Sequence, residues 1–329
     1  MARLVETGDD HEIARGYSVG GFAAGDWLHA KLSDPREAMR ASEWVVCARM
    51  RLGALQTHVI TRGLRLPDGT PLDLHGRALF HRAGAALTVR HDHLVTLHGR
   101  MARDCTGCVV HTEQTGVFTT ARQVAAPHER SQKRADVAVE DCGHHGFVAR
   151  GREVVRRRRE RGGRGVARRP HQADPGMAIG DVAVSDPHAP TYLSAASSQP
   201  LGCAALRESA KRSRHEADVV RAGGHFVPLV YETYGAMGRE AEVWFRGLIA
   251  VAHIEPPEWM AGAEAPELEE YDRWARAQLS ADWRRRMSVA LQRGNARIIL
   301  GGAARARSGT GVRVYGHMAR SDLDVGVGD

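Results

Sequence analysis

The sequence predicts an α/β fold in which a small mixed sheet is flanked by helices, with flexible arms and a C-terminal amphipathic helix. Two segments, 134–140 and 179–187, alternate apolar and polar residues as half-buried strands do. Apolar residues recur at helical spacing on either side of them, over 90–104 and 239–253. The length of 329 residues allows two domains, or one domain with long arms.

The first half of the chain is predicted to form two helices and two strands. Ser33 or Asp34 can cap a helix over 35–55, which is followed by a loop over 64–86. The helix over 90–104 leads into a short strand over 108–114, and a loop connects that strand to the one over 134–140. This part of the chain therefore supplies one helix and two strands to the sheet region.

The second half is predicted to be mostly helical. After the strand at 179–187, we expect helix over most of 192–222 and a strand over 225–231. Pro228 cannot donate a backbone hydrogen bond, so it places that strand at an edge or at a bulge. A long amphipathic helix is expected over 267–293, and Gly, Ala and Arg return from Gly301 onward, which indicates a frayed tail.

The net charge of +7 is typical of a protein with a polyanionic partner. The five cysteines are scattered, odd in number and not preceded by a signal peptide, which predicts reduced thiols and an intracellular location. No run approaches the ~18 apolar residues of a membrane span, so we expect no membrane partner. Aromatic residues make up only 5% of the chain and glycines number 36, which favours some poorly ordered segments.

The segment 150–169 contains ten arginines, including Arg156, Arg157, Arg158 and Arg159 in succession. Such a block repels itself, so we expect disorder over 150–176 unless a polyanion neutralises it. Two interpretations stay open: a nucleic-acid contact made by the four consecutive arginines, and a basic insertion with no dedicated partner. The insertion could also be an artefact of gene prediction.

Asp136 and Asp181 each open a Val-Ala-Val strand segment. If the two strands are neighbours, the carboxylates lie close together, and like charges at that distance usually share a cation. Mg²⁺ held by one or two carboxylates and a substrate phosphate is the commonest such arrangement. The alternative is that both residues are strand-end acids in solvent.

The order helix, strand, strand, strand, helix, strand, helix over 90–253 resembles the αβββαβ core of the restriction-endonuclease-like, or PD-(D/E)XK, nucleases. The local sequence motifs most closely resemble the endonuclease region that follows reverse transcriptase in some non-LTR retrotransposon polyproteins. The resembling pieces are Arg90-His91-Asp92, Lys133-Arg134-Ala135-Asp136, Asp181-Val182-Ala183-Val184, Ala210-Lys211-Arg212, Phe226-Val227-Pro228-Leu229 and Trp283-Arg284-Arg285-Arg286. The expected regions are a helical linker with a degenerate zinc knuckle over 1–86, an endonuclease-like domain over 87–255, and a C-terminal helix and tail over 256–329.

The resemblance implies a DNA endonuclease in which Asp136 and Asp181 hold Mg²⁺ against the scissile phosphate. Glu113 is a further candidate ligand, with a solvent-facing glutamate as its alternative. The family's lysine normally lies two residues after the second acid, where this chain has Ala183. Lys211 is the candidate replacement, to orient water or neutralise charge on the phosphate; its alternative is a solvated helix face. The implied partner is DNA, or RNA in place of DNA, with a nuclear location for a product of a eukaryotic retroelement.

Zinc is not expected, because each candidate set lacks ligands. The region of His75, Gly76 and His81 has no knuckle cysteines, and Cys105, Cys108 and His111 have no fourth partner, as is also the case around Cys142. The missing lysine and knuckle support a second hypothesis, a non-catalytic retroelement remnant that binds nucleic acid through its basic segment. A translated fragment without a stable fold is the third.

Overall fold

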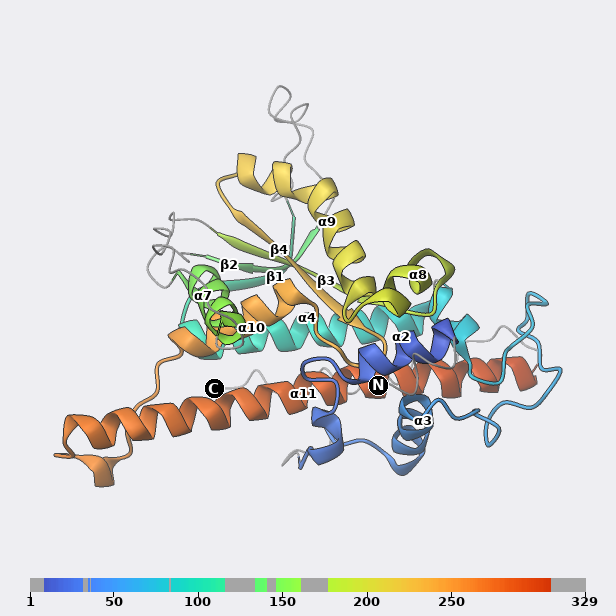
Figure 1. Cartoon of the computed structure of the whole chain (residues 1–329), viewed down its shortest axis with the longest axis horizontal. Helices are drawn as coiled ribbons and strands as arrows, with labels where there is room; N and C mark the ends of the chain where they lie inside the picture. Colours follow the sequence, from blue (N-terminus) through green and yellow to red (C-terminus); the bar gives the residue numbers. More distant parts are fainter. Residues whose placement is uncertain are drawn as a thin grey trace.

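The computed structural model describes residues 9–31, 35, 37–82, 84–115, 134–140, 146–160 and 177–308. Within these residues, eight α-helices surround one four-stranded sheet, which confirms the predicted mixed α/β class. Figure 1 shows the sheet between helices, with one very long helix, α11, running along the base of the molecule. No described helix combines the length and the apolar run that a membrane crossing needs.

The sheet has the order β1 (Val110–Thr115), β2 (Arg134–Val139), β3 (Ala178–Ser185) and β4 (His225–Glu232). β1 and β2 are antiparallel, β2 and β3 are antiparallel, and β3 and β4 are parallel. All four predicted strands are therefore present. Pro228 lies on β4, the last strand in this order, and its predicted edge position is confirmed.

Helices cover both faces of the sheet. α4 (Ala85–Thr106) and α10 (Arg239–Val251) pack on one face, and α9 (Gly202–Arg221) packs on the other (Figure 1). The helix predicted over 192–222 is divided into α8 (Pro190–Ser198) and α9. Pro200 explains the break, because the residue before a proline is disfavoured in a helix.

The expected disorder of the arginine-rich segment is wrong over 150–160, where helix α7 (Phe147–Glu160) forms. Phe147, Gly151 and Val155 recur every fourth residue and are buried. The helix packs so closely on α10 that a Cβ atom at Gly151 would lie 1.9 Å from the Val243 carbonyl oxygen. This buried stripe outweighs the charge repulsion; the rest of the segment, 161–176, lies outside the described residues.

α11 (Ala265–Ser308) is much longer than predicted, and the expected fraying from Gly301 is wrong as far as Ser308. The glycines here allow close packing, because a Cβ atom at Gly302 would lie 2.5 Å from the Leu79 side chain. What reads as a weak Gly-Ala tail is therefore a buried contact surface. Residues after 308 lie outside the described part of the chain.

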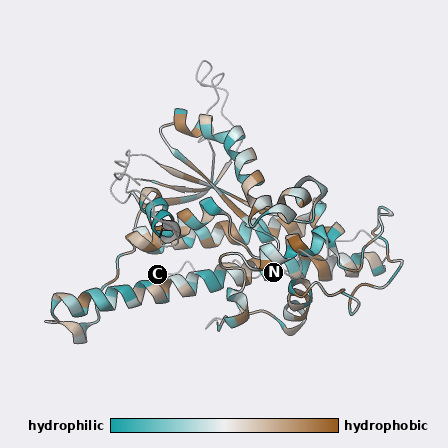
Figure 2. Cartoon of the chain, viewed as in Figure 1, coloured by the Kyte–Doolittle hydropathy of each residue, from teal (hydrophilic) through white to brown (hydrophobic). Residues whose placement is uncertain are grey.

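The 44-residue helix α11 contributes to two hydrophobic cores. Met287 and Leu291 pack into the core beneath the sheet, and Ile299 packs with Val46 and Leu72 into a second core. That second core contains α3 (Ala41–Arg51), the observed part of the helix predicted over 35–55, together with η1 (Asp26–His29) and η2 (Arg77–His81). Hydrophilic and hydrophobic residues alternate along α11 (Figure 2). Described residues of the predicted N-terminal and C-terminal regions, from Trp27 to Leu79 and from Val289 to Ala303, thus share one core.

Candidate active site

The site lies where β2 and β3 separate, a place that we call the fork. Pairing between these strands ends at Val137 and Gly180, although β2 continues beside β1 and β3 continues beside β4. The same register carries Asp136 to the position opposite Asp181. The charge of Asp136 is among the causes that raise the pKa of Asp181, as expected of two neighbouring carboxylates. The structure thus brings together the two aspartates that the sequence singled out.

Side chains replace the missing strand pairing at the fork. Val182, two residues past the last residue of β3 that pairs with β2, donates its backbone N–H to Asp136 Oδ2 at 2.6 Å. Its carbonyl oxygen accepts a hydrogen bond from Lys211 Nζ at 3.3 Å. Because buried backbone groups must be paired, the end of the ladder fixes both side chains in place.

Lys211 approaches the fork from α9, and its solvated-face alternative is wrong. The residue is only 9% exposed, and Nζ lies 2.5 Å from Asp181 Oδ1. His215, one turn further along the helix, places Nε2 4.0 Å from Asp181 Oδ2. Both side chains lie on the face of α9 that packs on the sheet, as their i, i+4 spacing requires.

His91 approaches the fork from α4, on the opposite face of the sheet, and the sequence assigned it no role. Its Nε2 atom lies 3.1 Å from Asp136 Oδ2. Asp136 Oδ2 therefore accepts from both His91 and Val182, and no donor to Oδ1 is found among the described residues. His91 stands within the resembling piece Arg90-His91-Asp92, but nothing in its spacing indicates a contact 45 positions along the chain.

Burial and neighbouring charges shift the pKa values of the titratable groups His91, Asp136, Asp181 and Lys211 at the fork. The hydrogen bond to Asp136 raises the pKa of His91 to about 9, so this imidazole is protonated at neutral pH. Burial favours the neutral form of Asp136, but the hydrogen bond and charge of His91 and the Val182 N–H outweigh it, and its pKa is lowered. Burial raises the pKa of Asp181 and lowers that of Lys211, although each charge favours the other. Two cationic groups thus face two carboxylates.

The remaining site predictions receive less support from the geometry. Glu113 is an exposed residue of β1 with a left-handed backbone (φ 56°). No group of three or more His, Cys, Asp or Glu side chains in the described part of the chain is arranged to hold a metal, so Glu113 does not join the aspartate pair in such a group. Arg156 and Arg157 both pair with Glu153, at 2.7 and 2.6 Å. The side chains of Arg158 and Arg159 lie outside the described residues.

The histidines and cysteines considered for zinc have other roles. His111 lies 2.8 Å from Glu140, and His81 lies 2.7 Å from Asp186. Cys105 is buried in α4, where burial raises the pKa of its thiol to about 12. Cys142 lies outside the described residues.

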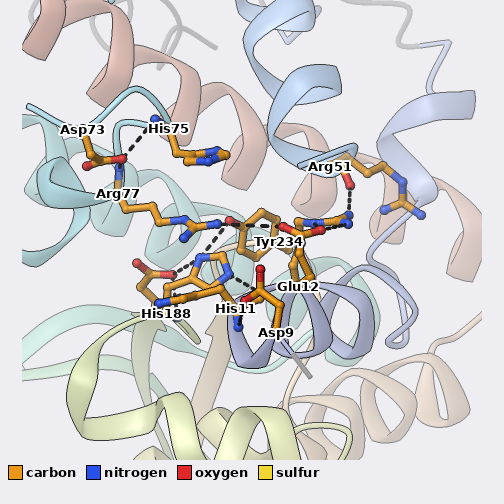
Figure 3. A network of polar contacts seen from close by, with 11 residues as sticks. Asp9, His11, Glu12, Arg51, Asp73, His75, Arg77, His188 and Tyr234 are labelled. Atoms are coloured by element: carbon orange, nitrogen blue, oxygen red, sulfur yellow. Dashed lines mark hydrogen bonds and ion pairs between the residues drawn. The ribbon is translucent and has the colours of Figure 1, made fainter. Parts of the chain in front are cut away.

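A second polar cluster lies just beyond the C-terminal ends of β3 and β4 (Figure 3). The Tyr234 hydroxyl donates to His188 Nδ1 at 3.0 Å, and His188 Nε2 donates to the His11 carbonyl oxygen at 2.8 Å. Asp186 accepts from the His188 backbone at 3.2 Å and from His81 at 2.7 Å. These five residues, which we call the connector network, join α2 (Asp10–Val19) and η2 to the sheet. Burial lowers the pKa of His188 to about 4.

Comparisons with protein-family models, with curated proteins and with solved structures found no match to this chain.

Proposed function

We propose that this chain is a Mg²⁺-dependent DNA endonuclease that hydrolyses phosphodiester bonds at the fork. One observation carries the proposal: two largely desolvated carboxylates from neighbouring strands lie near each other, with side chains only 14% and 15% exposed, and a buried lysine is ion-paired to one of them. Such a cluster costs folding free energy, because desolvated charges are stabilised less well than hydrated ones. Groups whose pKa is shifted by burial together with a specific charge partner concentrate at functional sites. The resemblance to retrotransposon endonuclease regions supports the same reaction.

The donor set suits Mg²⁺, which prefers oxygen ligands and often takes only one or two from the protein. Asp136 Oδ1 has no hydrogen-bond donor among the described residues, because Oδ2 accepts both available donors. Asp181 is the second carboxylate of the pair. When bound, the ion would polarise the phosphate and lower the pKa of a bound water.

The remaining residues of the fork would position the Asp136 side chain and neutralise negative charge on the phosphate. His91 and the Val182 N–H both hold Oδ2 of Asp136, which fixes the rotamer of this side chain and leaves Oδ1 for the ion. Lys211 would supply positive charge to the phosphate as negative charge develops in the transition state. Its ammonium group comes from α9, so it can take the role that the family assigns to the position of Ala183.

The test is nicking of supercoiled plasmid DNA by the purified chain with Mg²⁺ or with EDTA. We expect Asp181→Ala to abolish nicking. Asp282→Asn is the matched control, because that carboxylate is 43% exposed on α11 and pairs only with Arg286 among the described residues. Equal nicking by the wild type and Asp181→Ala would overturn the proposal.

A second candidate function is non-catalytic nucleic-acid binding. It is favoured by the ion pair of Lys211 with Asp181 and by the lack of a third acid gathered at the fork among the described residues. It predicts DNA affinity that falls steeply with salt, without cleavage. The test is to replace Arg156, Arg157, Arg158 and Arg159 by Gln. This substitution removes the charges but keeps helix α7, which packs on α10. Unchanged affinity and salt dependence in this variant would contradict it.

A further inference from the structure

The N-terminal end of α11 lies far from the sheet (Figure 1), and aromatic side chains are exposed there. The short helix η3 (Glu258–Met260) and the turn after it fold back beside the first turns of α11, and together they form a shallow hollow. Trp259 is 79% exposed and Trp274 is 58% exposed. Tyr271 stacks beside Trp274 with ring centroids 5.9 Å apart. We call these three residues the aromatic tip.

The charge around the aromatic tip is opposite to that of the whole chain. Residues 255–276, which contain the tip, hold seven carboxylates and only two basic residues, Arg273 and Arg276, whereas the chain has a net charge of +7. Glu267 and Glu270 line the hollow itself. Neither has an ion-pair partner among the described residues.

We propose that the aromatic tip binds an arginine-rich polypeptide segment of a partner protein. A guanidinium group stacks on the face of a tryptophan and, in the same pose, can donate two hydrogen bonds to a carboxylate. The hollow offers both features, because Trp259 and Trp274 line it together with Glu267 and Glu270.

Other occupants fit this surface less well. A nucleic acid would place its phosphates against the carboxylates. An apolar helix would bury Glu267 and Glu270 without a partner, which costs free energy. A second copy of the chain docked tip to tip would bring two acidic surfaces together. The proposal does not depend on catalysis at the fork.

The test is fluorescence anisotropy of a labelled octa-arginine peptide titrated with the full chain. We expect Trp259→Ala/Trp274→Ala to weaken binding by about tenfold, as the loss of two cation–π contacts implies. Glu267→Gln/Glu270→Gln should weaken it several-fold and flatten its salt dependence. Octa-lysine should bind less tightly than octa-arginine, since it cannot stack and pair as a planar fork does.

Trp44→Ala is the matched control, because Trp44 is another surface tryptophan, 47% exposed, on α3. It should leave peptide binding unchanged, and thermal melts should show that both tip variants keep the fold. Wild-type affinity in the tryptophan double variant would overturn the proposal, as would equal affinity for octa-lysine. Tip-dependent dimerisation in sedimentation, without peptide binding, would overturn it in favour of a second copy of the chain.

Discussion

The fork and the connector network are both built from histidines and aspartates around β3, yet they use their polar atoms differently. In the connector network, both ring nitrogens of His188 and both oxygens of Asp186 have hydrogen-bond partners. At the fork, Asp136 keeps an oxygen with no donor among the described residues, and two carboxylates oppose each other. His11 Nδ1 in the connector network is buried without a hydrogen-bond partner among the described residues, so the full pairing holds for His188 and Asp186. Fully paired buried groups of that kind fix a structure. An incompletely paired group is better suited to bind something.

The largest expected effect that separates the two regions is on cleavage by Lys211→Ala. Removing a charge that acts in the transition state costs about 10²–10³-fold in rate. We expect that loss in the plasmid assay. Arg214→Ala, an exposed cation on the same helix, should cleave at the wild-type rate. A Lys211→Ala variant with full activity would remove Lys211 from the proposed site.

Tyr234→Phe should do the reverse and reduce stability without affecting cleavage. It deletes the donor to His188 Nδ1 and leaves a buried acceptor unpaired. A buried unsatisfied group costs about 1–3 kcal/mol of the free energy of unfolding. Urea denaturation would measure this as a lower midpoint at an unchanged slope. Loss of cleavage at an unchanged midpoint would mean that the connector network is functional.

The pH dependence of stability should carry opposite signs in the two regions. Folding raises the pKa of His91 from 6.5 to about 9, so its contribution is complete below pH 6.5 and is lost as the pH rises to about 9. His91→Gln keeps a donor to Asp136 but does not titrate, and it should flatten stability over that window. His253→Gln, at an 85% exposed side chain, is the control and should leave the slope unchanged. An unaltered slope in His91→Gln would contradict the pairing.

His188 should give an effect of the opposite sign, at lower pH. Burial lowers its pKa from 6.5 to about 4, so its contribution is present above pH 6.5 and is lost as the pH falls through about 4. The unfolded chain binds the extra proton in this window. His188→Gln should therefore reduce the loss of stability on acidification. Denaturation midpoints measured between pH 4 and 7 check this prediction. A loss of stability in His188→Gln as large as in the wild type would contradict it.

Local pattern was enough to predict the four strands and to single out Asp136 and Asp181, but it left open whether their two strands are neighbours. A strand such as 134–140 can be predicted because alternating apolar and polar residues indicate that one face is buried. The Asp-Val-Ala-Val sequence that both strands share indicated that their aspartates occupy equivalent positions. The contact of His91 with Asp136 was not predictable in this way, because it depends on how α4 crosses the sheet. Lys211 was a candidate, but its burial depends on the packing angle of α9.

Two errors share a physical cause. In α7 and in the end of α11, composition suggested disorder, with arginines in one and Gly-Ala runs in the other. Both are ordered because Gly151 and Gly302 allow a neighbouring element to approach very closely. Such a contact is invisible in a count of residue types. It becomes apparent only when the small residue is placed against its partner.

The passage of α11 through both cores has a practical consequence for dissecting the molecule. A protein truncated to begin at residue 87 would keep the whole sheet but lose the covering of Ile299 and Ala303. The second half of α11 would then expose apolar side chains to solvent, and the truncated protein would tend to aggregate. Insolubility of such a truncated protein would therefore reflect the loss of this hydrophobic core and would say nothing about catalysis.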